Sequence, residues 1–217
     1  MQLEFLVEDV SGKRALEALI PKVIGATASF RIHAYKGVGR IPKGMRGEVD
    51  PSKRILLDAL PRLLSGYGQT FFKSGFPNAV FVICDLDDRN RERFLAELEG
   101  ALEGCLHKPN ALFCLAIEEG EAWLLGDLPA IYASFPQAKV AILQAYENDS
   151  ICGTWEVLAN ALVKGGGRAL VRGGWQEVGV EKSKWALQIP PKMDVESNLS
   201  PSFRDFRDTL RKTVACI

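Results

Sequence analysis

The sequence has only two histidines and no closely spaced cysteine pair, and these shortages argue against several common kinds of site. His33 and His107 lie far apart in the chain, without the spacing of metal ligands, so a zinc site built from His and Cys is not expected. The five cysteines, none of them in a CxxC pair, are Cys84, Cys105, Cys114, Cys152 and Cys216. Their odd number and scattered spacing argue against a disulfide framework and favour a reducing cytoplasm.

Long apolar runs and several well-known motifs are also missing. No run approaches the roughly 18 residues needed to span a bilayer, and the first residues carry neither the basic stretch nor the cleavage site of a signal peptide. A GxGxxG fingerprint is absent after the first predicted strand, where Gly12 is the only glycine, which argues against a dinucleotide-binding fold. The sequence has no GxSxG motif, which argues against a Ser/His/Asp hydrolase.

Charge of one sign is not in excess. The 217 residues include 27 Lys and Arg and 27 Asp and Glu, so the net charge is zero, and 47% of the residues are hydrophobic. This balance is typical of one large globular domain, or of one domain with an appended piece. A protein with this charge is not a general polyanion binder, so any contact with nucleic acid requires a local basic patch.

The most informative stretch is an apolar run, residues 80–84, that ends in three carboxylates, Asp85, Asp87 and Asp88. Five apolar residues without a polar break are typical of a strand buried on both faces of a parallel sheet. Ligands of open α/β sheets bind beyond the carboxyl ends of the strands. We therefore expect acidic chemistry at this point.

Two interpretations of these carboxylates remain open. Asp85 and Asp87 are two apart, so on an extended chain they point to the same side and repel each other unless a cation lies between them. Hard divalent ions such as Mg²⁺ prefer oxygen ligands. The alternative is a polar turn that caps a helix predicted over residues 89–100.

Two further apolar strands end in the same way. Residues 3–7 run into Glu8 and Asp9, and residues 111–117 run into an acidic stretch. Its three glutamates are Glu118, Glu119 and Glu121. The helices predicted between the strands imply parallel pairing, so the acidic ends share one edge of the sheet. This convergence favours a metal site, although spacing does not decide which of the three glutamates faces it.

A basic loop follows the strand predicted over residues 30–35. Its cations, interspersed with glycines, are Lys36, Arg40, Lys43 and Arg46. Such a loop can approach phosphates through backbone N–H groups, but the order of a Walker motif is missing. It is either an ordinary surface loop or the local basic patch that a neutral protein needs to bind nucleic acid.

Beyond residue 128 the pattern becomes helical. Short helices are predicted over 128–135, 140–147 and 154–162, and glycines at 165–167 and 173–174 predict loops. A last helix is predicted over 201–214. We therefore predict an α/β fold with a mostly parallel central sheet flanked by helices over residues 1–128, and a mainly helical extension packed on it over residues 129–217.

Two motifs in the second half resemble the signatures of a large uncharacterised bacterial Toprim-like family. They are EAWLLGD at residues 121–127 and NLSPSF at residues 198–203. The order of acidic strand ends is similar to that of the Toprim fold of topoisomerases, primases and OLD-type nucleases. The resemblance covers nearly the whole chain. Members of the family are often encoded beside an ABC-type or AAA ATPase, a context linked to phage defence.

The resemblance implies roles for the acidic residues. Glu8 would act as general acid and base, and Asp85 and Asp87, together with Glu8, would hold Mg²⁺ or Mn²⁺ for phosphodiester cleavage. Toprim glutamates are usually followed by glycine, whereas Asp9 stands here and either crowds the substrate or adds a ligand. The further accessory acids are Asp88, Glu118 and Glu121. Trp123 either stacks on a base or lies in the core.

Two functions are expected on this basis. The first is a Mg²⁺-dependent nuclease acting on DNA or RNA, as the effector of a two-component defence system with an ATPase. The second is a Toprim-like module without catalytic activity that docks on an ABC- or AAA-type ATPase. The zero net charge and Asp9 favour the second function, whereas the convergent acidic edge favours the first.

Overall fold

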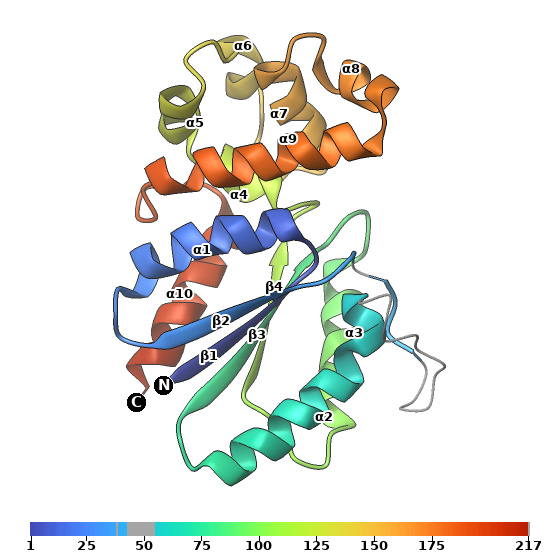
Figure 1. Ribbon diagram of the computed structural model, residues 1–217, viewed down its shortest axis with the longest axis vertical. Helices are drawn as coiled ribbons and strands as arrows, with labels where there is room; N and C mark the ends of the chain where they lie inside the picture. Colours follow the sequence, from blue (N-terminus) through green and yellow to red (C-terminus); the bar gives the residue numbers. More distant parts are fainter. Residues whose placement is uncertain (38, 43–54, 217) are drawn as a thin grey trace.

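The computed structural model describes residues 1–37, 39–42 and 55–216, which form an α/β structure (Figure 1). Its strands are β1 (Gln2–Val7), β2 (Ser29–Ala34), β3 (Asn78–Asp85) and β4 (Ala111–Ala116). Its helices are α1 (Val10–Ile24), α2 (Leu56–Ser74), α3 (Arg91–Glu103), α4 (Glu121–Leu125), α5 (Leu128–Ser134), α6 (Val140–Gln144), α7 (Thr154–Leu162), α8 (Gly166–Gly173), α9 (Trp175–Gln188), the short 3-10 helix η2 (Pro190–Lys192) and α10 (Pro201–Ala215). The predicted fold class is confirmed and is consistent with the Toprim-like arrangement that the resemblance implies.

The four strands form one sheet in the order β2-β1-β3-β4, and every pair of neighbours is parallel. Val7, the last residue of β1, lies opposite Ile83 of β3. Because the strands run in the same direction, their carboxyl ends meet at one edge. The sheet therefore brings the residues that follow β1, β3 and β4 close together, as the acidic strand ends predicted.

Both faces of the sheet are covered, which explains the unbroken apolar runs. Alternate residues of β1 and β3, such as Phe5 and Phe81, belong to the core on the side of α1 and α10. The residues between them, such as Leu6 and Val82, pack with α2 and α3 on the other side. A strand that is buried on both faces has no polar alternation. The start predicted for α2, at residue 51, lies outside the described residues.

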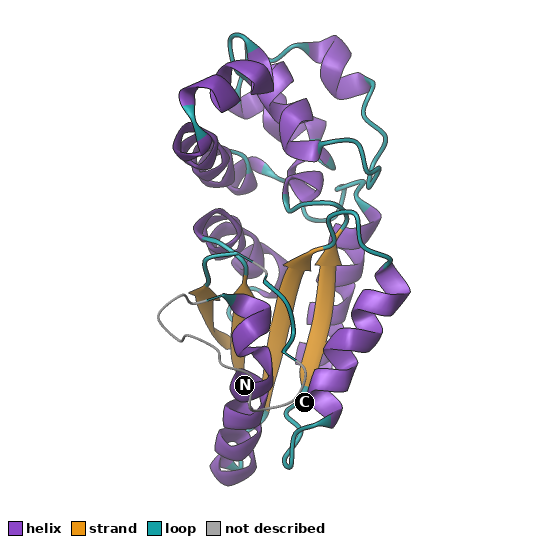
Figure 2. Ribbon diagram, turned by 90° about the vertical axis from the view of Figure 1, so that its right-hand side faces the viewer, coloured by secondary structure: helices purple, strands orange, loops and turns teal. Residues whose placement is uncertain are grey.

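The last helix, α10, returns to the sheet after the helical segment. Phe206 lies 6.5 Å from the rings of both Phe5 and Phe81, measured between ring centroids, and stacks on Trp123 at 4.9 Å. Helices α5 to α9 lie beyond the carboxyl ends of the strands, and both termini lie at the opposite end of the molecule (Figures 1 and 2). The chain thus leaves the sheet after β4 and comes back with α10.

The two motifs of the second half meet at the point where the chain leaves and returns. The side-chain amide of Asn198 donates a hydrogen bond to the carbonyl oxygen of Trp123 at 2.9 Å, and the indole N–H of Trp123 donates to the hydroxyl of Ser202 at 3.0 Å. The backbone N–H of Leu199 donates to the carbonyl oxygen of Gly126 at 2.8 Å. Trp123 is only 4% exposed, so it belongs to the core.

Helices α8 and α9 differ from the sequence prediction. Glycines at 165–167 and 173–174 predicted loops, yet Gly166 and Gly167 are buried inside α8. Gly166 has a positive φ of 66°, and a Cβ there would lie 2.2 Å from Oδ1 of Asn160 on α7, so backbone conformation and tertiary packing both favour glycine at this position. The helix α9 then starts directly after Gly174.

Two further observations concern the described residues. None of the described helices is both long and apolar enough to cross a membrane. All five cysteines have free thiols, and Cys84, Cys105 and Cys114 are buried. The absence of a disulfide framework agrees with the cysteine spacing.

Candidate functional site

Glu8 and Asp85 lie side by side at the carboxyl edge of the sheet. Glu8 follows β1 directly, and Asp85 is the last residue of the neighbouring strand β3. The backbone N–H of Asp85 donates a hydrogen bond to Oε1 of Glu8 at 2.8 Å. The structure therefore brings the carboxylate of Glu8 to the backbone of Asp85, and both residues line one pocket.

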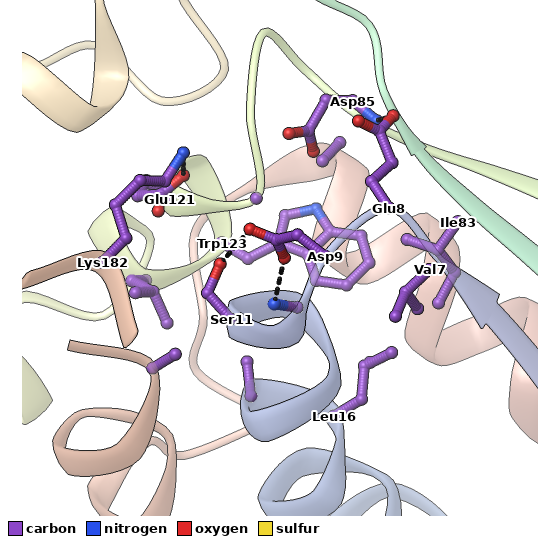
Figure 3. A pocket seen from close by; sticks show the side chains of 16 residues that line it. Val7, Glu8, Asp9, Ser11, Leu16, Ile83, Asp85, Glu121, Trp123 and Lys182 are labelled. Carbon is purple, nitrogen blue, oxygen red and sulfur yellow. Dashed lines mark hydrogen bonds and ion pairs between the residues drawn. The ribbon is translucent and has the colours of Figure 1, made fainter. Parts of the chain in front are cut away.

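The two carboxylates line a pocket between the sheet, α1, α4 and α9 (Figure 3). Its wall includes Val7, Ile83 and Trp123, and its volume is about 60 Å³. One water needs about 10–15 Å³ on this measure, so the pocket can hold a few waters or a partly hydrated ion. A nucleotide is too large to enter it and has to bind at its mouth.

Lys182, on α9, faces the carboxylates from the helical segment (Figure 3). Its ammonium nitrogen lies 3.2 Å from Glu121 and 3.5 Å from Glu119, and its side chain is 18% exposed. Burial by itself would lower the pKa of Lys182, but the charges of Glu121, Glu119 and Asp85 outweigh burial and raise the pKa above its usual range. Lys182 therefore stays charged and partly compensates the acidic edge.

Lys182 is not among the predicted site residues, because no helix is predicted over residues 175–188 from the sequence. A signal was nevertheless present. Val178, Trp185, Ala186 and Ile189 are buried and follow a helical period, and Lys182 falls on the same face. A lysine on the apolar face of a helix needs an acidic partner.

Burial and nearby negative charges shift the titration of the two central carboxylates. Burial raises the pKa of Glu8 to about 8, with the nearby charges of Asp87 and Asp9 acting in the same direction, although the N–H of Asp85 opposes the shift. Burial and the charge of Glu8 raise the pKa of Asp85 well above its usual range, against the attraction of Lys182. The pair therefore holds a proton near neutral pH when no other cation is bound.

This shift predicts that the metal-free protein becomes less stable as the pH rises. The pKa of Glu8 is 4.5 in its ordinary state and about 8 in the folded protein, so its stabilising contribution is complete below pH 4.5 and is lost as the pH rises towards 8. One pKa unit corresponds to about 1.4 kcal/mol, and water at the mouth of the pocket reduces the full value. We expect a loss of about 2 kcal/mol.

Urea unfolding in the presence of EDTA at several pH values measures this effect. Glu8→Gln removes the titrating group, so its unfolding free energy should depend less on pH than that of the wild type. A wild-type protein whose stability rises over this pH range, or a Glu8→Gln variant that follows it closely, would contradict the assignment.

Asp9 caps the start of α1 and also lines the pocket (Figure 3). Its carboxylate accepts hydrogen bonds from the backbone N–H of Gly12 at 2.7 Å and from the hydroxyl of Ser11 at 2.5 Å. An aspartate in this position satisfies N–H groups that would otherwise have no partner. Each of its oxygens thus accepts one hydrogen bond from the first turn of α1.

The expected alternation of Asp85 and Asp87 is not found. The strand ends at Asp85, and Asp87 has a positive φ of 52°, so the two residues are not on one extended segment. Asp87 does not line the pocket but pairs with Arg89 at 3.7 Å. Its charge is still close enough to raise the pKa of Glu8. Asp88 is exposed.

Glu118 is turned away from the pocket, towards α7. Its carboxylate accepts hydrogen bonds from the N–H groups of Cys152, Gly153 and Thr154 and from the hydroxyl of Thr154, at 2.7 to 3.2 Å. Burial alone would raise the pKa of Glu118, but these hydrogen bonds outweigh it and lower the pKa. Glu118 therefore caps α7, and Glu121 is the glutamate of this stretch that lines the pocket.

The structure describes part of the basic loop. Lys36 and Arg40 are exposed and follow β2, so they lie beyond the same edge of the sheet as Glu8. The backbone N–H of Arg40 donates a hydrogen bond to Asp58 at 3.0 Å. Lys43 and Arg46 lie outside the described residues.

The donor set of the pocket suits a hard cation with few protein ligands. Within the described ranges, no three His, Cys, Asp or Glu side chains converge closely enough to hold a metal ion. Mg²⁺ typically binds through one or two carboxylates, several waters and the phosphates of its substrate. Glu8 and Asp85 supply two adjacent carboxylates whose repulsion a cation would relieve. This pair suits Mg²⁺, which binds through few protein ligands, better than it suits an ion that needs a shell made only of protein ligands.

Comparisons of the chain with protein-family models, with curated proteins and with solved structures find no match. What the pocket does is therefore inferred from its own residues.

Proposed function

We propose that this protein is a Mg²⁺-dependent nuclease, with Glu8 and Asp85 at the centre of its site. The observation that carries the proposal is the direct contact between these two residues, which lie 77 positions apart in sequence. Asp87, whose charge reaches Glu8, is then an outer contributor to the same site. Mn²⁺ is expected to replace Mg²⁺, because both prefer oxygen ligands.

The residues of the pocket suggest how they act on a phosphodiester. The bound ion would neutralise the charge that develops on the phosphate. Oε1 of Glu8 accepts the N–H of Asp85, so Oε2 is the oxygen that can take or give a proton. In the metal-free protein the pKa of Glu8 is raised to about 8, and a cation bound beside it would lower this pKa towards the neutral range that suits a general acid or base.

A nearby arginine supports a phosphate as the substrate group. Arg89 lies between Asp87, at 3.7 Å, and the ring of Phe94, at 4.6 Å from its centroid. Its Nη1 atom is buried and has no hydrogen-bond partner among the described residues. A buried N–H without a partner is costly. Arg89 does not line the pocket, so its side chain would have to turn towards a bound phosphate to satisfy this N–H.

Calorimetric titration with Mg²⁺ and Mn²⁺, followed by cleavage assays, tests the proposal. We expect one weak ion site and cleavage of plasmid, single-stranded DNA or tRNA that stops in EDTA. Arg89→Lys keeps the positive charge but cannot donate two parallel hydrogen bonds to a phosphate. This variant is expected to weaken cleavage more than ion binding. The absence of both ion binding and cleavage in the wild type would overturn the proposal.

A second candidate is a module without catalytic activity that docks on an ABC- or AAA-type ATPase. The ion pairs of Lys182 favour it, because they already compensate part of the acidic edge without a metal. Co-purification with an ATPase, in a protein that neither binds divalent ions nor cleaves nucleic acid, would support this function instead.

A further inference from the structure

Three cations on and beside α8 are exposed and have no acidic partner. Arg168 and Arg172 lie one turn apart on α8, and Lys164 precedes the helix by two residues. No ion pair joins these side chains to a carboxylate within the part of the chain that the structure describes. Residues four apart on a helix face the same way, so the two arginines form a small basic surface.

An exposed tryptophan lies next to this surface. Trp175, the first residue of α9, is 72% exposed, although most tryptophans in proteins are largely buried. One side of its ring is held by the buried Trp155, with centroids 6.2 Å apart and planes at 60°. The indole is thus fixed in position while most of its surface faces solvent, which suits a flat ring that stacks on it.

The position of Trp175 connects this surface with the pocket. Lys182 lies seven residues further along α9, which is nearly two turns, so both residues lie on the same side of the helix about 10 Å apart along its axis. Helix α8 packs against α9 (Figure 1). The basic surface and the tryptophan therefore continue from the pocket along the helical segment.

We propose that Arg168, Arg172, Lys164 and Trp175 bind single-stranded nucleic acid and guide it to the pocket. The cations match the charge of the phosphates, and an exposed aromatic ring offers stacking to an unpaired base. Because this chain has no net charge, a local basic surface of this kind is needed for such binding. Two acidic side chains lie beside it, Glu177 close to Gly173 and Glu156 close to Gly167. The role in guiding substrate rests on the proposed nuclease function, whereas binding itself does not.

Fluorescence anisotropy in EDTA measures binding without cleavage. The probes are a labelled oligothymidylate, an oligouridylate of the same length and a duplex of mixed sequence. We expect both single strands to bind more tightly than the duplex, and their relative affinity distinguishes DNA from RNA. Tighter binding of the duplex, or no binding of any probe, would overturn the proposal.

Two variants separate the contributions of charge and stacking. The double variant Arg168→Gln/Arg172→Gln is expected to bind about tenfold or more weakly, and the slope of log affinity against log salt should become shallower by about 1.4, or 0.7 for each lost phosphate contact. Trp175→Leu is expected to weaken binding about five- to 150-fold without changing the slope.

Matched controls remove the same charge and the same kind of ring elsewhere. Lys73 and Lys212 are exposed, and Phe76 is 77% exposed; Lys73 and Phe76 lie around the turn that leads into β3, at the amino end of the sheet. Lys73→Gln/Lys212→Gln and Phe76→Leu are expected to bind like the wild type. If they weaken binding as much as the α8 and Trp175 variants do, the proposal is wrong.

Failure of this inference can be told apart from failure of the nuclease proposal. Binding in EDTA that depends on Arg168, Arg172 and Trp175, without cleavage when Mg²⁺ is added, supports the binding surface and contradicts the nuclease. Cleavage that is unchanged in all the α8 and Trp175 variants supports the nuclease and contradicts the binding surface. Circular dichroism of each variant confirms that these exposed substitutions leave the fold intact.

Discussion

Replacing Asp85 by Asn is expected to abolish divalent-ion binding and to lower nucleic acid cleavage more than about 100-fold. Removal of a residue that supports a metal ligand typically lowers metal affinity or activity about 10–100-fold. Removal of a direct ligand should lower them more. The amide has almost the same shape as the carboxylate, and the N–H of Asp85 that contacts Glu8 belongs to the backbone and is retained. The loss would therefore come from charge rather than from a rearranged site.

The same substitution is expected to make the metal-free protein more stable. Burial raises the pKa of Asp85, and the charge of Glu8 beside it in the pocket raises it further. An amide removes the buried charge, so we expect a gain of about 1–2 kcal/mol at pH values above 7. A variant that is more stable but inactive distinguishes a functional carboxylate from a structural one.

Asp88→Asn is the matched control for Asp85→Asn. Asp88 is exposed in the same loop, so its loss should change stability by less than about 0.5 kcal/mol and leave ion binding and cleavage close to wild type. Calorimetric titration, cleavage rates and urea unfolding measure the three quantities. Cleavage that persists in Asp85→Asn would exclude the site.

Replacing Lys182 by Met is expected to destabilise the protein by about 3–5 kcal/mol, because removal of one partner leaves buried charges without compensation. Glu121 is 6% exposed and Glu119 is 21% exposed, and both rely on Lys182 as their described ion-pair partner. Burial already raises the pKa of Glu119 to about 7 despite Lys182. Without the lysine, these carboxyl groups must take up protons or draw water into the pocket.

A second change tests whether charge causes this loss. Adding Glu119→Gln and Glu121→Gln to Lys182→Met removes the uncompensated charges, so much of the lost stability should return. Lys184→Met serves as control, because Lys184 pairs with the partly exposed Glu181 on the same helix and lies 5.9 Å from the centroid of the Phe135 ring, and exposed pairs contribute about 1 kcal/mol or less. Equal losses in urea unfolding for the two lysine variants would contradict the role of Lys182.

The sheet and the first half of the site were predictable from sequence because they follow from local patterns. Three apolar runs separated by helices predict a parallel sheet whose acidic strand ends share one edge. That β1 and β3 are direct neighbours, which places Glu8 beside Asp85, is a finding of the structure. The directions of side chains could be predicted only as far as the end of the strand. Beyond Asp85 the backbone turns, and the positive φ of Asp87 removes the alternation on which its expected direction depended.

The positions of Lys182 and Glu118 could not be predicted from the sequence, because they depend on tertiary packing. Lys182 approaches the pocket on a helix whose start is surrounded by glycines, and glycine usually indicates a turn. Glu118 was expected with the other acids, but its oxygens are held by the N–H groups at the start of α7. Which of several adjacent glutamates faces a site depends on such distant partners, and spacing does not contain that information.

The hydrogen bonds between Leu199 and Gly126 and between Asn198 and Trp123 tie together the two ends of residues 128–197. Because these hydrogen bonds hold the two ends close together, residues 128–197 can be removed as one segment, and a short linker would join the remaining chain. A protein shortened in this way would keep Glu8 and Asp85 on the sheet but lose Lys182. Such a minimal version would show whether the bare acidic edge can bind an ion by itself.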